Sequence, residues 1–417
     1  MVDTGVARRL AAVGGRVVPL AFGLLLDLVE RDRRAAVTRR LARIAEDLGG
    51  AFHKAAQLLA TRSDLLSEPQ RVVLGRLCDR ATPDPYPRIR HVVESTLSAR
   101  QLGLLAAVDP VPAACGSVAQ IHHARLSRDG RRIVLKVRRP GVAERFRADL
   151  RIIRALVQIA NRIPAMATYP LATAVDQLET AIMGQLDFAA EARTQRFFCE
   201  AFAGSPDIAV PAIIDELCGE EVIAMDLVEC GLRIDSPSLT EGAQARAVRT
   251  ALRALYAMIF RHGLVHCDFH PGNLLVTPEG RLVLLDFGYT AVLVERDRRA
   301  FAELMLAVSF NDPHSAARIV ADSGTPLVGP VNMGELADDL GRILEEMSGA
   351  SADRFHIVRF VLELFAVQRR HAILGDPGFT MAIMSLLAVE GLLRTALPDL
   401  DFQREAVGYL AEALGEC

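Results

Sequence analysis

One polar segment, residues 266–288, constrains the fold of this chain more than any other stretch of its sequence. It opens with the run His266-Cys267-Asp268-Phe269-His270-Pro271-Gly272-Asn273. A turn at Pro278-Glu279-Gly280 follows, and the segment ends with Leu282-Val283-Leu284-Leu285 and then Asp286-Phe287-Gly288. An apolar run behind such a turn is typical of a buried strand, so we expect Asp286 to be held rigidly at the strand's end.

The spacing within this segment indicates a particular chemistry. Asp268 and Asn273 are five residues apart, and Asp286 follows Asn273 by thirteen. The same order occurs in protein kinases, where the first aspartate orients or deprotonates the attacking hydroxyl and the other two side chains bind magnesium. Magnesium prefers oxygen ligands, which carboxylates and amide carbonyls supply. Asp-Phe-Gly alone commonly ends a strand at a turn, and His-Pro-Gly alone is commonly a loop, so only the combination indicates magnesium-dependent phosphoryl chemistry.

Lysine is almost absent from the chain, which has 48 basic residues but only two lysines, Lys54 and Lys136. Chance could leave two lysines at any positions. The functional alternative is that both sites need a compact ammonium group, which fits between phosphate oxygens and a carboxylate where the broader guanidinium does not.

Lys136 lies in the strand-like segment Ile133–Val137, where a buried lysine is costly unless it is paired. One interpretation is purely structural: Lys136 lies at a strand edge and its side chain reaches solvent. The functional one is a lysine that contacts nucleotide phosphates and is fixed by a glutamate on a packed helix. Glu191 is the candidate partner, and Asp187, four residues before it and on the same predicted helix face, is a second candidate for this site.

Hydrophobic periodicity and turn residues predict the other elements. The first 105 residues predict helices at Arg8–Glu30, Arg33–Asp47, Phe52–Thr61, Glu68–Asp79 and Arg88–Leu97. Val118–Leu126 and Arg132–Arg138, on either side of Arg128-Asp129-Gly130, predict a β-hairpin. Two long helices, Val142–Arg162 and Leu171–Phe202, are expected next, then short strands at Ile208–Val210 and Glu221–Val228, and a mainly helical remainder from Glu241.

This order predicts an α+β fold of two lobes with a cleft between them. We expect an N-terminal helical extension in residues 1–105, a small sheet-containing lobe in residues 106–230 and a larger helical lobe in residues 231–417. With 417 residues, 51% of them hydrophobic, the chain can bury a large core and is not disordered. Its net charge of −3 supplies no field for gripping nucleic acid, so we expect no nucleic-acid partner.

Cysteine usage and hydropathy bear on location. The seven cysteines are scattered and include no C-x-x-C pair, which favours a reducing cytosol. The apolar run Val17–Val29 is shorter than the about 20 residues that span a bilayer, and no small-residue cleavage site follows it, so no signal peptide is expected. The longer run Phe379–Leu397 contains Glu390 and Arg394, and we expect a core helix there.

Five short motifs occur in one order along the chain: Lys54-Ala55-Ala56-Gln57, Ala114-Cys115-Gly116-Ser117-Val118-Ala119-Gln120-Ile121-His122, Lys136-Val137-Arg138-Arg139-Pro140-Gly141, Leu186-Asp187-Phe188-Ala189-Ala190-Glu191-Ala192 and His266 to Asn273. Together they resemble the UbiB (AarF/ADCK) family of atypical kinases. The resemblance runs from about residue 45 to 405 and includes Glu390-Gly391 and Leu397-Pro398-Asp399.

The resemblance implies a protein-kinase-like fold whose N-terminal helices cover the cleft, with ATP and Mg²⁺ as cofactors. It implies ATP hydrolysis or phosphotransfer in support of isoprenoid quinone or other lipid metabolism, without a defined protein substrate. An alanine-rich loop would replace the glycine-rich loop over the phosphates, here with Ala114, Gly116 and Ser117. The implied roles of the remaining residues are catalysis for Asp268, nucleotide binding for Lys136 and Glu191, metal binding for Asn273 and Asp286, and a reach into the cleft for Lys54 and Gln57.

The chain departs from the family pattern at three positions. Ala56 replaces the glycine of the family's K-x-G-Q, which matters if that position needs φ > 0 or a close approach. Gln185 replaces the glutamate of the family's E-x-D, so Lys54 is expected to rest on Asp187 or to be held less firmly. Gly116 stands in the alanine-rich loop, where it could let the backbone approach phosphate more closely.

Two other functions and a membrane contact stay open. A non-catalytic nucleotide-binding scaffold of a biosynthetic complex would also keep these residues. An aminoglycoside-type kinase shares the H-x-D-x-x-x-x-N spacing but lacks the helical extension that carries Lys54. The six arginines between residues 31 and 43 form either a solvated helix face or an interfacial helix on anionic lipid. We therefore expect a cytoplasmic protein with a possible peripheral contact at the inner face of the membrane.

Overall fold

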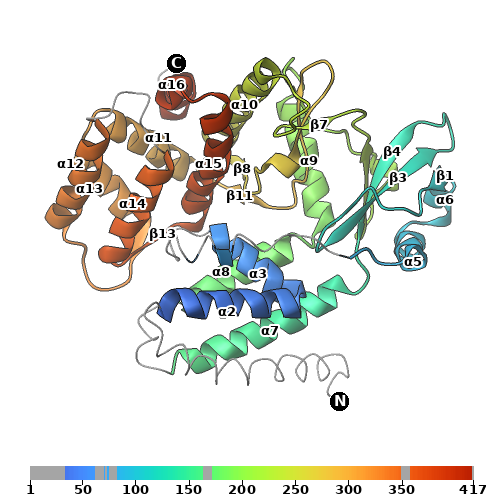
Figure 1. The fold of residues 1–417 in the computed structure, drawn as a ribbon, viewed down its shortest axis with the longest axis horizontal. Coiled ribbons are helices and arrows are strands. Elements are labelled where there is room, and N and C mark those ends of the chain that lie inside the picture. The colour runs from blue at the N-terminus through green and yellow to red at the C-terminus, as the bar shows by residue number, and fades with distance from the viewer. Residues whose placement is uncertain are drawn as a thin grey trace. The chain divides into compact units, whose positions relative to one another are not determined.

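The computed structural model describes residues 33–61, 70, 73–74, 82–162, 171–348 and 357–415. These form two compact units, one of Met1–Arg193 with Ile213–Leu227 and one of Thr194–Ala212 with Val228–Cys417 (Figure 1). The helix expected at Arg8–Glu30 and most of the helix expected at Glu68–Asp79 lie outside the described residues. The predicted division into an extension and two lobes stays a prediction.

The first unit contains an antiparallel sheet in the order β1-β3-β4-β6, with β2 paired to β3. Its strands are β1 (Leu105–Val108), β2 (Ala114–Cys115), β3 (Ala119–Leu126), β4 (Arg132–Arg138) and β6 (Val222–Asp226). The predicted hairpin is confirmed as β3 and β4, and the candidate at Glu221–Val228 as β6. In this register Lys136 lies between Ile121 of β3 and Ile223 of β6.

Alternate residues of β4 face opposite sides of the sheet. Ile133, Leu135 and Val137 are fully buried against α5 (Tyr86–Thr96) and the 3₁₀ turn η1 (Asp215–Leu217). A short helix, α6 (Ala99–Leu102), follows α5. The opposite face buries Ile223 against Phe188 from a following helix, and Lys136 shares that face.

Four helices of the first unit pack together: α2 (Arg33–Leu48), α3 (Gly50–Thr61), α7 (Val142–Ala160) and α8 (Leu171–Gly184). The turn between α2 and α3 contains Gly49 and Gly50, both with φ of +58°, which only glycine adopts without strain. At the start of α3 the backbone N–H of Ala51 donates to Asp149 Oδ2 of α7 over 3.0 Å, and Asp149 is fully buried. A buried carboxylate thus stabilises the positive end of the helix that carries Lys54.

The single helix predicted for Leu171–Phe202 is wrong. The chain forms α8 (Leu171–Gly184) and α9 (Phe188–Ala201), separated by a turn at residues 185–187. Asp187 causes the restart, because its Oδ1 accepts the backbone N–H of Ala190 over 2.8 Å as a helix N-cap. Asp187 therefore precedes the helix and does not share a helix face with Glu191.

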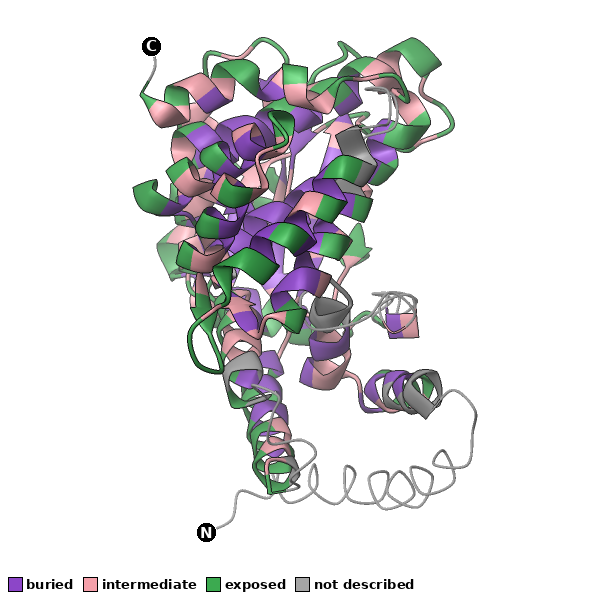
Figure 2. Ribbon diagram, turned by 90° about the vertical axis from the view of Figure 1, so that its left-hand side faces the viewer, coloured by how far each residue is buried: buried purple, intermediate pink, exposed green. Residues whose placement is uncertain are grey.

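The second unit is built around one apolar core of helices. These are α10 (Glu241–Tyr256), α11 (Glu295–Ser309), α12 (Pro313–Asp322), α13 (Met333–Ser348), α14 (Ile357–Arg370), α15 (Pro377–Ala396) and α16 (Phe402–Leu414). They share a continuous set of buried residues, and the ribbon in Figure 2 is purple where residues are buried and green where they are exposed. The mainly helical remainder predicted from Glu241 is confirmed.

Helix α15 covers the apolar run that raised the question of a membrane span. By length and composition Gly378–Ala396 is apolar enough to cross a bilayer, but most of it is buried inside the structure. The helix begins with Asp376 as N-cap, and its buried face includes Glu390. This agrees with the predicted core helix.

Short strands complete the second unit and carry the polar segment of residues 266–288. One sheet has the order β5-β10-β9-β7, with β5 (Ile208–Ala209), β10 (Leu282–Leu284), β9 (Leu274–Val276) and β7 (Leu232–Arg233). Separate pairs are β8 (Leu264–His266) with β11 (Thr290–Val292), and β12 (Gly324–Pro326) with β13 (Ile373–Gly375).

A π-helical turn, η2 (Ala257–His262), leads from α10 into β8. It ends at Gly263, which has a φ of +64°, and a Cβ there would lie 2.7 Å from the carbonyl oxygen of Leu293. Only glycine fits this position. The sharp exit sets the direction of β8 and of the polar segment that follows it.

Candidate functional site

The first group of predicted site residues is a buried ion pair in the first unit. Lys136 Nζ of β4 donates to Glu191 Oε1 of α9 over 2.6 Å. The two residues are only 8% and 3% exposed. The predicted pairing of Lys136 with Glu191 is therefore confirmed, and the solvent-reaching strand-edge lysine is wrong.

The surroundings of this pair suit an ammonium group. The Nζ atom of Lys136 lies 5.6 Å from the centre of the Phe188 ring, within the range of a cation–π contact. Phe188 is fully buried and begins α9, so the turn that Asp187 caps also fixes the ring beneath the lysine. Because little water reaches the pair, an unpaired charge here would be costly.

The alanine-rich loop lies at the same sheet. Ala114 and Cys115 form β2, and Gly116 and Ser117 make the turn into β3, closed by the backbone N–H of Gly116 donating to Ala119 O over 2.9 Å. Because Ala114 pairs with Ile121, and Ile121 pairs with Lys136 on β4, the loop and the lysine belong to neighbouring strands. The binding roles of Ala114, Gly116, Ser117 and Asp187 stay predictions.

The K-x-G-Q-like motif lies on α3. Lys54 is half-buried, and within the part of the chain that the structure describes it forms no ion pair with Asp187. Gln57 belongs to α3, but its side chain lies outside the described residues. Ala56 is buried against Ala42 and Ala45 of α2 in ordinary helical backbone, so this position requires a small side chain rather than a positive φ.

The second group of site residues lies in the second unit, on either side of the β9–β10 hairpin. Asn273 ends the 3₁₀ turn η3 (Pro271–Asn273), and its Nδ2 donates to Asp268 O over 2.9 Å and to Asp268 Oδ2 over 3.4 Å. Only the amino end of an amide can make both bonds, so the amide orientation is fixed. The Oδ1 atom, which is the atom a hard metal ion would bind, points away from them.

Asp286 lies at the same end of the hairpin. Leu274 pairs with Leu284, and the next backbone bond runs from Leu285 N to Asn273 O over 2.9 Å. Asp286 is therefore one residue beyond the partner of Asn273. It is exposed and has a φ of +56°, an uncommon conformation for a residue with a side chain. The ladder places the backbones of Asn273 and Asp286 at the same end of the β9–β10 hairpin.

His266 organises this group, and we did not predict it as a functional residue. Its Nε2–H donates to Leu285 O over 3.0 Å, and its Nδ1 accepts the backbone N–H of Asp268 over 3.2 Å. The two bonds fix a neutral tautomer. Burial lowers the pKa of His266, which agrees with the neutral form. The ring thus connects the residue before Asp286 with the backbone of Asp268.

Two aromatic contacts support the ring of His266. The ring centres of His266 and Phe287 are 5.3 Å apart, and those of Phe198 and Phe287 are 5.2 Å apart. Burial raises the pKa of the neighbouring Cys267 thiol to about 12, so little thiolate forms at neutral pH. The predicted roles of the two carboxylates and the amide in this segment stay predictions.

The described residues do not form a metal site made of protein side chains alone. Among the residues that the structure places, no group of three or more His, Cys, Asp and Glu side chains could hold a metal ion. A magnesium ion held with a nucleotide needs fewer protein ligands, because phosphates and waters supply the rest. Asn273 and Asp286 offer oxygen atoms of that kind.

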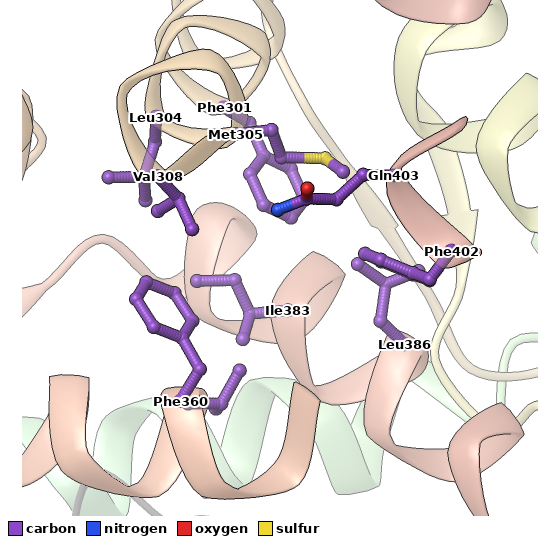
Figure 3. Close-up of a pocket in the computed structure, with 10 residues that line it drawn as sticks. Phe301, Leu304, Met305, Val308, Phe360, Ile383, Leu386, Phe402 and Gln403 are labelled. Atoms are coloured by element: carbon purple, nitrogen blue, oxygen red, sulfur yellow. The ribbon is translucent and has the colours of Figure 1, made fainter. Parts of the chain in front are cut away.

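An apolar pocket of the second unit is a different feature. It lies among α11, α14, α15 and α16, and nine of the ten residues lining it are apolar (Figure 3). Its one polar side chain is Gln403. Because none of its lining residues is titratable, it cannot perform phosphoryl chemistry and is not the candidate site.

Comparison with known proteins agrees with this geometry. The family described as the ABC1 atypical kinase-like domain matches residues 76–320, which is more than half of the chain. The chain belongs to the ABC1 atypical kinase-like family. It is thus a kinase-like protein, and the predicted resemblance and protein-kinase-like fold are confirmed.

Relatives of known name cover most of the chain. A probable protein kinase UbiB of Aeromonas hydrophila is 30% identical and aligns with 91% of this chain and 71% of its own length. One from Shewanella woodyi is 29% identical over 90% of this chain and 70% of its own. The structure of Rv3197 with erythromycin from Mycobacterium tuberculosis shares the fold, with a TM-score of 0.53, 24% identity, and coverage of 85% of this chain and 94% of that one.

The Lys136–Glu191 pair makes a prediction about stability. Lys136→Met and Glu191→Leu should each lower the free energy of unfolding by about 3–5 kcal/mol, because each leaves one buried charge unpaired. The double variant should recover most of that loss. Urea unfolding of the four proteins measures the cycle, and additive losses would contradict it. Arg90→Gln, which breaks an exposed pair with Glu94, is the control and should change little.

His266 makes a prediction about pH. Its folded-state pKa is below the ordinary value of 6.5, so the unfolded chain binds the proton more readily. The stability that neutral His266 contributes should be complete above about pH 6.5 and decline as the pH falls below it. His266→Gln should make this decline shallower in urea titrations at pH 5 to 8. The exposed His91→Gln is the control, and equal slopes for both variants would contradict the assignment.

Proposed function

We propose that this chain is an ATP- and Mg²⁺-dependent phosphotransferase or ATPase. The observation that carries the proposal is the buried Lys136–Glu191 pair, because burying an ammonium group is costly and is typical of a functional site. The second support is the fixed amide of Asn273 at the same end of the β9–β10 hairpin as Asp286.

The residues present fit this cofactor. Lys136 would contact the phosphates, with Glu191 holding its amine in place, and the loop of Ala114, Gly116 and Ser117 would cover the phosphates. Asn273 and Asp286 would hold magnesium through oxygen atoms. Bound magnesium would neutralise the charge on the phosphates, and the chain's own residues would fix its place.

Asp268 is the proposed catalytic residue. Its carboxylate is 42% exposed and lies 3.5 Å from His270 Nε2, while Asn273 Nδ2 contacts the same oxygen over 3.4 Å. Asn273 contacts both the backbone oxygen and the carboxylate of Asp268. A carboxylate positioned in this way can orient an attacking hydroxyl or water, or accept its proton. Lys54 and Gln57 are proposed to contribute to the same reaction, as the UbiB resemblance implies.

The proposed substrate is a lipid or another small molecule, such as an isoprenoid quinone precursor. This rests on the family resemblance alone, because the named relatives are called probable protein kinases, a name that gives protein and not lipid as the acceptor. A nucleotide-binding scaffold without turnover is the second candidate. Such a scaffold would keep the same nucleotide-binding residues, including the Lys136–Glu191 pair.

Turnover separates the two candidates. Asp286→Asn and Asp268→Asn should each reduce magnesium-dependent ATP turnover at least about 100-fold, because each removes a charge needed for metal binding or for orienting the attacking group. Phosphate release measured with and without lipid acceptors tests this. Glu279→Gln, in the exposed turn between β9 and β10, is the matched control and should keep wild-type turnover. Turnover retained in Asp286→Asn would contradict the proposal.

We also propose a peripheral contact with anionic membranes through the basic segment of residues 31–43. Arg39 and Arg43 are exposed on α2, and the structure describes neither Arg31 nor the side chains of Arg33 and Arg34. Each basic residue near such a surface contributes about 1 kcal/mol and less at high salt. Arg39→Gln with Arg43→Gln should reduce flotation with phosphatidylserine vesicles at low salt. Equal flotation of the variant, or of wild type with neutral vesicles, would contradict it.

A further inference from the structure

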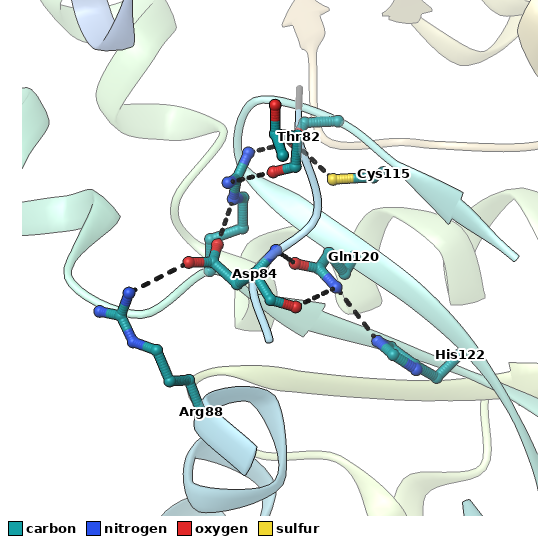
Figure 4. A network of polar contacts seen from close by, with 8 residues as sticks. Thr82, Asp84, Arg88, Cys115, Gln120 and His122 are labelled. Atoms are coloured by element: carbon teal, nitrogen blue, oxygen red, sulfur yellow. Dashed lines mark hydrogen bonds and ion pairs between the residues drawn. The ribbon is translucent and has the colours of Figure 1, made fainter. Parts of the chain in front are cut away.

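We infer that Arg139 is a positioning residue that holds the alanine-rich loop in place for the nucleotide's phosphates. The inference rests on the proposed function. It adds a residue that is not among those proposed to bind phosphate, bind metal or act in catalysis. Its basis is a network of polar contacts around Asp84 and the loop (Figure 4).

One guanidinium group joins the segment of residues 82–84 to the alanine-rich loop. Arg139 Nε donates to Asp84 Oδ2 over 2.7 Å, one terminal nitrogen donates to Gly116 O over 3.2 Å, and the other donates to Thr82 O over 2.8 Å. Its backbone N–H also donates to Val118 O over 2.9 Å. Arg139 therefore holds both sides of Ser117, the residue at the tip of the loop.

The network is largely shielded from water. The side chains of Arg139 and Asp84 are 15% and 12% exposed, so their charge-assisted bonds are stronger than those of a surface pair. The planar fork of arginine supplies three donors at fixed angles, which a lysine cannot do. A purely electrostatic surface contact would not need this geometry.

The far side of the network is fixed by buried polar groups. The backbone N–H of Asp84 donates to Gln120 Oε1 over 2.5 Å, and Gln120 Nε2 lies 3.4 Å from His122 Nε2. His122 Nδ1 lies 2.8 Å from Asp109 O, and both Gln120 and His122 are fully buried in β3. These bonds fix the position of Asp84. The contacts of Arg139 therefore restrain the loop relative to a fixed segment.

The position of Arg139 links the loop to the lysine. It follows β4 immediately and is three residues after Lys136, so one short segment carries both the phosphate-binding amine and the group that fixes the loop. A loop held at both sides keeps its backbone N–H groups in one arrangement before a ligand binds. Loss of Arg139 should therefore weaken contacts with phosphates and leave contacts with the base and ribose unchanged.

The test compares binding of ATP and adenosine by wild type, Arg139→Ala and Arg139→Lys in equilibrium titrations. Arg139→Ala should bind ATP about tenfold more weakly, which corresponds to the loss of a charge-assisted hydrogen bond, and should bind adenosine as wild type does. Arg139→Lys keeps the charge beside Asp84 but not the fork, and should recover only part of the affinity. Arg88→Gln is the matched control, because Arg88 contacts the other oxygen of Asp84 from an exposed position and does not reach the loop.

Hydrogen exchange of the backbone amides of residues 115–118 gives a readout without nucleotide. These amides should exchange faster in Arg139→Ala than in wild type or Arg88→Gln, with thermal melting as the check that each variant is folded. Where Arg139→Ala does not fold, Arg139→Lys carries the comparison. Unchanged loop exchange, or equal weakening of ATP and adenosine, would overturn the inference. Failure of wild type to bind ATP would overturn the proposed function, and the exchange result would then decide the positioning role of Arg139 alone.

Discussion

A buried ion pair between β4 and α9 connects the fold of the first unit to its proposed chemistry. Lys136 cannot lie on an interior sheet face without a counter-charge, and Glu191 supplies one at 2.6 Å. The pair in turn requires α9 to start where it does, because a longer helix through residues 185–187 would change the helical position of Glu191. The Asp187 cap, the Phe188 ring and the paired strands are the local means by which the chain maintains this one contact.

In the second unit, neutral groups position the predicted site residues. A histidine in a fixed tautomer, a fixed amide and a backbone ladder place Asp268, Asn273 and Asp286 without any buried charge among the supporting groups. The π-helical exit from α10 and the tight fit at Gly263 direct β8 toward this segment. Rigid placement of this kind is what catalysis by positioning requires, since the groups need not reorganise during the reaction. It also explains why the strain at Asp286 is tolerated: strands β9 and β10 determine the backbone on one side of it.

Much of this could be predicted from sequence, because the signals are local. The hairpin of β3 and β4 follows from strand-like runs around a glycine turn, and the Lys136–Glu191 contact follows from the cost of a buried lysine. The break before α9 could not be read from periodicity, since apolar spacing continues through Gln185 and Asp187, and only the capping bond shows where the helix restarts. The role of His266 was missed because its function depends on a carbonyl nineteen residues away. Arg139 belongs to one of the quoted motifs, but its contacts could not be predicted. Its partners Asp84 and Gly116 lie far from it in the chain.

The central claim is that one bound ATP depends on Lys136 for its phosphates and on Asp286 for its metal. Calorimetric titration of ATP into wild type, Lys136→Met/Glu191→Leu and Asp286→Asn, each with and without magnesium, tests this most directly. The account predicts one site in wild type that binds more tightly with magnesium, weaker binding by the double variant under both conditions, and loss of only the magnesium effect in Asp286→Asn. Equal affinity of all three proteins, with the same response to magnesium, would contradict it.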